Sequence, residues 1–326
     1  MPNTRPTAIV VAALAALTLA ACSSTADSSE ATSTGDADAC PGDVLDIVVS
    51  VDQWGDVVRP LAGDCGTVTT VINSTAVDPH DYQPTTGDIA VFDQADLVVV
   101  NGADYDHWAS DALANVDPQP TLVDVADVVG IEEGHSEEGH SEDEEEEHGA
   151  VDPHLWYSPD HVQEAAAVIT STLQELDPDA ADYFTEQATA WTAQLQPYLD
   201  EVAALEASAG GKTYAATETV FDYMAQAVGL TDVTPEGYRS ASSNESDPAP
   251  GDVAAFESAL ADGSIDVLVY NTQTEGSVPE QLRSAAESAG VPVVDVTESV
   301  PENDPSFVEW QLAQLQQLSA ALGGSQ

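Results

Sequence analysis

The chain has 326 residues, of which 59 are Asp or Glu and only 5 are Lys or Arg, so its formal net charge is −54 at pH 7. So acidic a surface repels nucleic acid and anionic lipid headgroups, which excludes a nucleic-acid-binding role. We interpret the acidic excess as a solvated, halophile-like surface, against which no single acidic residue is informative by itself.

The first residues predict an export signal followed by a lipid anchor. Arg5 is the only charged side chain before the apolar run over residues 8–21, and about 14 apolar residues are too few to cross a bilayer as a helix. Small residues directly precede Cys22, as in bacterial lipoprotein signals, where the cysteine becomes the lipidated first residue of the mature chain. We expect residues 1–21 to be the signal peptide and residues 22–42 to be a flexible polar tether. The alternative is an ordinary secretory signal with a chance cysteine.

The two other cysteines, Cys40 and Cys65, form an even pair in an exported chain. They lie just ahead of two apolar stretches, residues 44–51 and 68–72. If these stretches are neighbouring parallel strands, both cysteines lie at the same edge of the sheet and within bridging reach. An oxidising compartment favours a disulfide over two unpaired thiols.

Residues 43–176 alternate predicted strands and helices. The strands are continuous apolar runs, as expected where helices cover both faces of a parallel sheet. We predict strands over residues 47–51, 68–72, 97–101 and 121–125, and helices over residues 53–61 and 88–94. This alternation predicts an α/β lobe.

An acidic insertion, residues 132–149, interrupts this lobe. Between Glu132 and His148 the chain has ten acidic residues, three histidines and no apolar residue. Such a segment cannot bury enough apolar surface to fold, so we expect a disordered surface loop. Its histidines predict an accessory, low-affinity metal-collecting site at His135, His140 and His148. The alternative is an acidic insertion with incidental histidines.

The strongest helical periodicity lies between the two halves of the chain. Apolar side chains recur every three or four residues from Phe184 to Leu205. Asp177 before Pro178 is typical of a helix start, and a Gly-Gly pair at residues 210–211 is typical of its end. We expect a linking helix over residues 177–209, about 50 Å long at 1.5 Å per residue.

After this helix the strand-and-helix pattern returns. We predict strands over residues 213–216, 265–270 and 291–296, and helices over residues 220–227 and 252–260. Residues 210–324 are therefore predicted to be a second lobe. The fold class is α/β, with two lobes on parallel sheets joined by one long helix and a cleft between them.

Two short segments resemble each other and predict metal ligands. The chain reads Asp-Pro-His-Asp-Tyr around His80 and Asp-Pro-His-Leu-Trp around His154. Each histidine follows a proline, which limits backbone freedom, and has a carboxylate nearby that could accept a ring N–H and fix the tautomer. A lone histidine is usually structural, but two in matched settings favour ligands.

In combination these features resemble the ZnuA-like or TroA-like solute receptors of ABC importers, which bind zinc or manganese. The resemblance runs from about Asp46 to Leu322 and includes both histidine segments, the Asn101-Gly102 pair, the acidic loop and the linking helix. It implies a metal held in the cleft by one histidine from each of two motifs in the N-terminal lobe and by two ligands from the C-terminal lobe.

By this resemblance, His80 and His154 are the first two ligands. The third falls at Glu218, at the carboxyl end of a predicted strand, where zinc receptors usually have histidine and manganese receptors glutamate. The fourth is typically an aspartate in the loop after the next-to-last strand. This chain has none there, so Glu275 is our choice and Gln273 the fallback.

The implied cargo is Zn²⁺, with Mn²⁺ as the alternative. Two imidazoles and two carboxylates can hold zinc tetrahedrally, whereas oxygen-rich ligand sets also suit manganese. The resemblance further implies a monomer that is not an enzyme, anchored to the outer face of the cell membrane through Cys22, with an ABC permease and its ATPase as partners.

The sequence leaves two other classes of protein open. A metal-dependent hydrolase would keep an open metal position and a nearby general base, but the chain has no His-Glu-x-x-His motif. A siderophore receptor of the same architecture would need cationic residues for an anionic chelate, and this chain has few.

Overall fold

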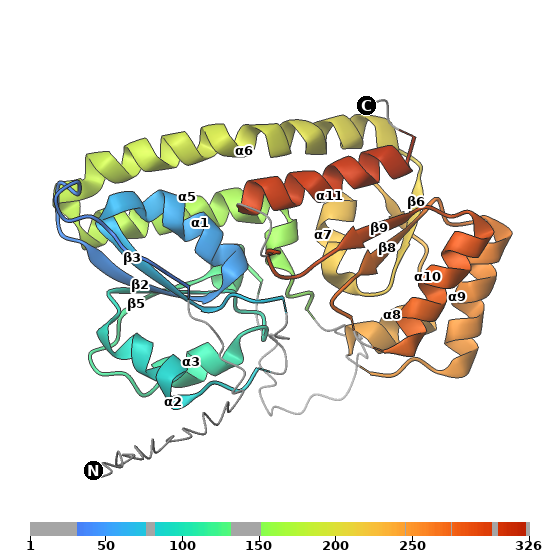
Figure 1. Cartoon of the computed structure of the whole chain (residues 1–326), viewed down its shortest axis with the longest axis horizontal. Helices are drawn as coiled ribbons and strands as arrows, with labels where there is room; N and C mark the ends of the chain where they lie inside the picture. Colours follow the sequence, from blue (N-terminus) through green and yellow to red (C-terminus); the bar gives the residue numbers. More distant parts are fainter. Residues whose placement is uncertain are drawn as a thin grey trace, which may run out of the picture.

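The computed structural model describes residues 31–75, 82–131, 151–244, 246–274, 276–301 and 306–323. Two α/β lobes lie side by side, and helix α6 (Ala181–Ala209) runs along both of them (Figure 1). The predicted fold class, two lobes with parallel sheets and one long helix, is confirmed. Within the described ranges, every helix is too short or too polar to span a bilayer.

The N-terminal lobe is built on a five-stranded sheet in the order β1-β3-β2-β4-β5. Its parallel strands are β2 (Leu45–Val51), β3 (Gly66–Ile72), β4 (Leu97–Val100) and β5 (Thr121–Asp124). One face is covered by α1 (Asp52–Ala62) and α5 (Pro159–Leu176), and the other by α2 (Thr86–Ala90) and α3 (His107–Leu113) (Figure 1). Because both faces are covered, six of the seven residues of β2 are buried.

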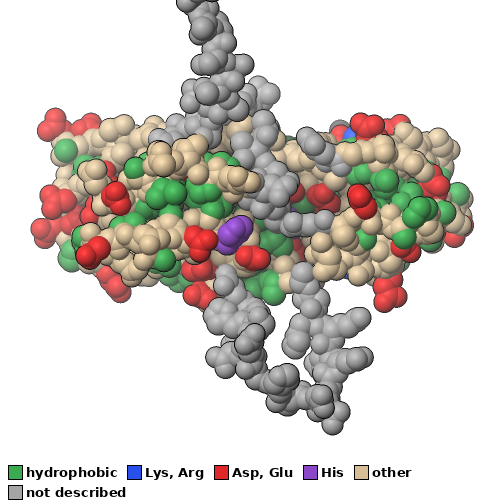
Figure 2. All heavy atoms as spheres, turned by 90° about the horizontal axis from the view of Figure 1, so that it is seen from below, with side chains coloured by type: hydrophobic (Ala, Val, Ile, Leu, Met, Phe, Trp, Pro, Cys, Tyr) green, Lys and Arg blue, Asp and Glu red, His purple; other side chains and the backbone are tan. Residues whose placement is uncertain are grey.

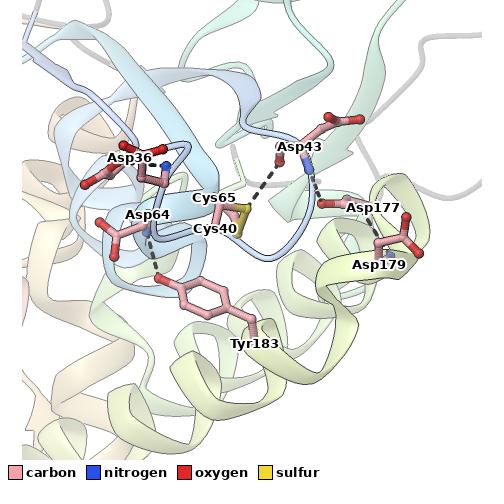
Figure 3. The surroundings of a disulfide bond; sticks show 9 residues. Asp36, Cys40, Asp43, Asp64, Cys65, Asp177, Asp179 and Tyr183 are labelled. Carbon is pink, nitrogen blue, oxygen red and sulfur yellow. Dashed lines mark hydrogen bonds between the residues drawn. A yellow bond between two sulfur atoms is a disulfide. The ribbon is translucent and has the colours of Figure 1, made fainter.

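Residues 31–42, which we expected to belong to a flexible tether, are packed against the N-terminal lobe. Strand β1 (Ala31–Ser33) pairs antiparallel with β3 at the edge of the sheet. The predicted Cys40–Cys65 disulfide is confirmed, with Cα atoms 4.9 Å apart (Figure 3). The backbone N–H of Asp43 donates to the carboxylate of Asp177, 2.9 Å away. These long-range contacts attach the chain to the lobe from residue 31 onward, which polar composition alone does not reveal.

The C-terminal lobe has a four-stranded parallel sheet in the order β7-β6-β8-β9. The strands are β6 (Thr213–Ala216), β7 (Thr231–Asp232), β8 (Val267–Asn271) and β9 (Val293–Val296). The helices of this lobe are α7 (Asp222–Ala227), α8 (Glu236–Ser243), α9 (Pro250–Asp262), α10 (Ser277–Ala289) and α11 (Phe307–Ala321).

One hydrophobic core is shared by the two lobes. It extends from the N-terminal sheet through α6 to the face of the C-terminal sheet that α7 and α11 cover, and a second, smaller core lies under α8, α9 and α10. The predicted apolar stripe of α6 is buried in the shared core at Phe184, Trp191, Leu195, Tyr198 and Leu205. The lobes therefore cannot swing widely apart without exposing apolar surface to water.

Candidate metal site

The candidate site lies where the two lobes meet, at the carboxyl ends of strands from both sheets. Parallel α/β sheets place ligand-binding side chains at this edge. Acidic side chains are spread over both lobes on the face shown in Figure 2, as expected from the formal net charge of −54. Such a surface raises the local concentration of cations.

His154 provides the imidazole of the N-terminal lobe. It precedes the 3₁₀ turn Leu155–Tyr157 that leads into α5, and only 5% of its surface is exposed. Its Nδ1 lies 2.6 Å from Oδ1 of Asp152. Its Nε2 lies 3.9 Å from Oε2 of Glu298, which belongs to the C-terminal lobe. The Asp152 hydrogen bond fixes the ring, as partners of metal-binding histidines commonly do.

Glu218 follows β6, at the predicted end of the strand. Its Oε2 accepts a hydrogen bond from the side-chain amide of Asn271, the last residue of β8. Burial, and then the negative charge of Glu298, raise the pKa of the Glu218 carboxyl. Two carboxylates thus lie close enough to repel each other unless a cation or a hydrogen-bond donor lies between them.

Glu298 is a site residue that we did not predict. It lies in the turn after β9 and is 8% exposed. Asn271 Nδ2 donates to its Oε1 at 2.8 Å, and the Tyr105 hydroxyl donates to its Oε2 at 3.3 Å. The sequence did contain one indication of this role: Glu298 comes just after the last predicted strand, at the edge of the sheet where ligand-binding residues of α/β proteins lie. In so acidic a chain that signal is weak.

A strained turn presents Tyr105. Gly102, Ala103 and Asp104 have positive φ values of 72°, 54° and 63°, a conformation that is unfavourable for residues other than glycine. The carboxylate of Asp106 stabilises the turn by accepting the backbone N–H groups of Asn101 and Gly102 at 2.7 and 3.0 Å. These hydrogen bonds offset the backbone strain of the turn. The turn positions the Tyr105 hydroxyl at the junction of the lobes.

The carboxylates around His154 favour its protonated form. Burial lowers the pKa of His154, but the charges of Asp152, Glu298 and Glu218 outweigh burial and raise the pKa to about 9. An imidazole must lose its second proton before it can bind a metal. A metal ion and a proton therefore compete for Nε2.

Gln273, the fallback ligand, joins the two lobes. Its Oε1 accepts the backbone N–H groups of Glu298 and Ser299 at 2.7 and 3.0 Å. Its Nε2 donates to the backbone carbonyl of Thr75, 3.2 Å away in the N-terminal lobe. Its side chain thus holds the Glu298 turn against the segment that leads toward His80.

Several predicted residues lie outside the described part of the chain, and their roles stay predictions. They are Cys22, His80, His135, His140, His148 and Glu275. Of the predicted ligands, the structure describes His154 and Glu218. Glu298 lies 3.9 Å from His154 and shares the side-chain amide of Asn271 with Glu218.

The donor set of these residues suits a divalent transition metal. In the described ranges, no three His, Cys, Asp or Glu side chains are already grouped so that they could hold a metal. His154 Nε2 and Glu298 Oε2 are nevertheless 3.9 Å apart. Because zinc binds nitrogen and oxygen ligands at about 2.0–2.2 Å, one ion can bond to both atoms from between them. Asn271 holds the Glu218 carboxylate beside that of Glu298.

The sequence matches a known family over most of its length. Residues 47–321 match the family described as ZnuA, zinc-uptake complex component A, periplasmic. The chain belongs to this ZnuA family. The resemblance inferred from the combined motifs is thereby confirmed, and the family consists of metal-binding solute receptors rather than enzymes.

Relatives of this ZnuA-family chain include proteins named for zinc and for manganese. The high-affinity zinc uptake system protein ZnuA of Bacillus subtilis is 28% identical over 256 residues, which cover 74% of this chain and 76% of that protein. The manganese-binding lipoprotein MntA of Halalkalibacterium halodurans is 28% identical over 202 residues, 59% of this chain and 60% of that protein. The zinc-binding lipoprotein AdcA of Streptococcus pneumoniae is 24% identical over 265 residues, 80% of this chain but 51% of that protein.

Solved structures show the same ZnuA-family fold. The periplasmic zinc-binding protein TroA from Treponema pallidum has a TM-score of 0.68 at 19% identity, covering 85% of this chain and 99% of TroA. The manganese-bound periplasmic metal-binding protein from Candidatus Liberibacter asiaticus has a TM-score of 0.67 at 19% identity, with the same coverage. At such identities the likeness shows the fold alone.

Proposed function

We propose that this chain is the extracytoplasmic receptor of an ABC importer, which captures a divalent transition metal and delivers it to the permease and its ATPase. The observation that supports this most is the approach of His154 Nε2, from one lobe, to within 3.9 Å of Glu298 Oε2, from the other lobe. Glu218 is joined to Glu298 through the side-chain amide of Asn271. A metal bound by both lobes stabilises the state in which they are joined, by mass action. The permease can then distinguish loaded from empty receptor.

The ligand set that we propose is His80, His154, Glu218 and Glu298. Glu298 takes the fourth place because its carboxylate is 3.9 Å from the His154 imidazole. Glu275 is the competing candidate from sequence, and a direct comparison of the two variants decides between them.

We propose Zn²⁺ as the favoured cargo and Mn²⁺ as the next. Two imidazoles and two carboxylates fill a tetrahedral zinc site without water, which suits capture rather than hydrolysis. Relatives named for each metal match this chain, so the family alone does not decide the preference. The preference has to come from the site itself.

We further propose that the receptor is a monomer held to the membrane by a lipid on Cys22. MntA and AdcA are named lipoproteins. The histidines of the acidic loop, His135, His140 and His148, would collect metal weakly without forming part of the tight site.

The test is a titration of Zn²⁺ and Mn²⁺ into the mature protein in high salt, which screens the diffuse acidic surface. We expect one tight site in the wild type, and its loss in His80→Ala and in His154→Ala. Glu298→Gln should weaken zinc binding by about 10-fold to 100-fold, and Glu275→Gln should weaken it less. Tight binding that survived both histidine substitutions would place the metal on the acidic loop and refute the cleft site.

A further inference from the structure

A single neutral side chain lies between the two carboxylates of the C-terminal lobe. Asn271 is 2% exposed, and its Nδ2 donates both to Glu218 Oε2 and to Glu298 Oε1. A primary amide has two N–H donors, so each carboxylate takes one of them. Asn271 thus holds together two groups that would otherwise repel each other.

The orientation of this amide is set by its other hydrogen bond. Asn271 Oδ1 accepts the backbone N–H of Gln273 at 3.0 Å. Flipping the amide would point its NH₂ group at that N–H and its oxygen at two carboxylates, which no hydrogen bond could satisfy. The surroundings therefore determine that donors face Glu218 and Glu298.

These contacts restrict how each carboxylate can bind a metal. One oxygen of Glu218 and one of Glu298 are engaged by Asn271, and Tyr105 from the N-terminal lobe restrains Oε2 of Glu298. The Glu298 oxygen nearest His154 is Oε2, and it keeps a second lone pair beside the one that accepts from Tyr105. With its other oxygen held by Asn271, each carboxylate then offers a metal one oxygen rather than two. Fewer oxygen ligands favour four-coordinate Zn²⁺, whereas Mn²⁺ suits octahedral, oxygen-rich sites.

We propose that Asn271 is a specificity-determining residue, which favours zinc over manganese by making Glu218 and Glu298 bind through one oxygen each. Tyr105 supports it by restraining Glu298 from the other lobe. This inference rests on the proposed function, because it concerns the same cleft. It adds a residue that does not itself bind the metal, and a reason for the metal preference.

The test measures the ratio of the Kd for Mn²⁺ to the Kd for Zn²⁺ by competition titration of the mature protein. Asn271→Asp keeps the size of the side chain and its acceptor for Gln273, but removes the donors and frees both carboxylates. We expect it to lower the ratio by about 10-fold or more, the scale of effects from partners of metal ligands. Tyr105→Phe removes one of the hydrogen bonds that restrain Glu298 and leaves both Asn271 donors in place, so its shift should be smaller but in the same direction.

Two matched controls test whether an added negative charge, or the loss of a tyrosine hydroxyl, changes the Kd ratio when it lies away from the site. Asn244→Asp adds the same charge at the exposed end of α8, where the side chain donates to the carbonyl of Ser240. Tyr183→Phe removes a hydroxyl that accepts the backbone N–H of Asp64, beside the disulfide (Figure 3). Both should leave the ratio unchanged.

Co²⁺ absorption gives a second readout, because four-coordinate Co²⁺ absorbs visible light far more strongly than six-coordinate Co²⁺. We expect strong absorption in the wild type and weaker absorption in Asn271→Asp.

Equal losses of affinity for both metals with unchanged Co²⁺ absorption would overturn the inference and leave the receptor function standing. If Asn271→Asp does not fold, an unchanged ratio in Tyr105→Phe overturns it. A wild type without a tight site would overturn the proposed function and this inference with it.

Discussion

At the scale of the residue, His154 combines deep burial with three carboxylate neighbours. Burial lowers its pKa, but Asp152, Glu298 and Glu218 outweigh burial and raise the pKa to about 9. Below that pH the metal-free protein holds a proton that a bound metal must displace. As the pH falls, metal binding therefore begins to weaken at a higher pH than it would if His154 had the ordinary pKa of a histidine.

This competition predicts the number of protons that metal binding releases. We expect about one proton per Zn²⁺ at pH 7, and an affinity that rises by up to about tenfold per pH unit between pH 6 and pH 8. Calorimetry in two buffers of different ionisation enthalpy measures the proton count. Binding without proton release would mean either that Nε2 is not a ligand or that its pKa is near the ordinary value.

Asp52, the first residue of α1, makes a separate prediction about stability. It is 6% exposed, and burial raises the pKa of its carboxyl to about 8. The unfolded carboxyl ionises near pH 4, so its contribution to folding is fully present below that pH and is lost as the pH rises toward 8. Asn cannot ionise, so Asp52→Asn avoids this loss. We expect the free energy of unfolding of the variant to exceed that of the wild type by about 1–3 kcal/mol at pH 8. The difference, measured by urea denaturation, should be much smaller at pH 4.

At the scale of the element, the disulfide attaches the start of the ordered chain to β3. Cys40 and Cys65 are 25 residues apart, and both lie near the amino ends of β2 and β3. The site lies at the carboxyl ends, about 20 Å away along a seven-residue strand. The crosslink therefore acts on stability rather than on metal binding.

Replacing both cysteines by serine should lower the free energy of unfolding by about 3 kcal/mol, because the open chain gains loop entropy when it unfolds. Denaturant midpoints of the oxidised wild type and the double variant measure this difference. The Kd for zinc of the double variant should stay within about twofold of the wild-type value. This change is much smaller than the one expected when a residue next to a metal ligand is replaced. A large loss of affinity would show that strain at β3 reaches the site.

At the scale of the whole molecule, the shared core limits how far the lobes can move. The core continues from the N-terminal sheet through α6 to α11, and the Gln273–Thr75 hydrogen bond crosses between the lobes. We therefore expect metal binding to tighten the loops around the cleft rather than to rotate one lobe against the other.

Deletion of residues 132–149 tests whether the acidic loop is separate from the tight site. The segment has no apolar residue between Glu132 and His148, so the core does not depend on it. We expect unchanged thermal stability and unchanged tight zinc binding, with fewer weakly bound ions in equilibrium dialysis. Loss of the tight site on deletion would show that at least one of its ligands lies in the loop.

The amino-acid sequence by itself determined the two lobes and the linking helix, because each depends on local patterns, and it indicated the disulfide through an even pair of cysteines placed ahead of two predicted strands. Continuous apolar runs indicate buried parallel strands, and the repeat from Phe184 to Leu205 indicates one helix. His154 was also recognisable, because its proline, aromatic and carboxylate neighbours lie within two residues of it.

Only the tertiary structure decided which carboxylates face His154. Glu298, Asn271 and Tyr105 come from segments far apart in the sequence, and they meet because two sheets direct their carboxyl ends toward one junction. Among 59 acidic residues, spacing cannot distinguish a carboxylate that faces another lobe from one that faces water. The pairing of β1 with β3 was hidden for the same reason, because a polar edge strand is specified by its partner rather than by its own pattern.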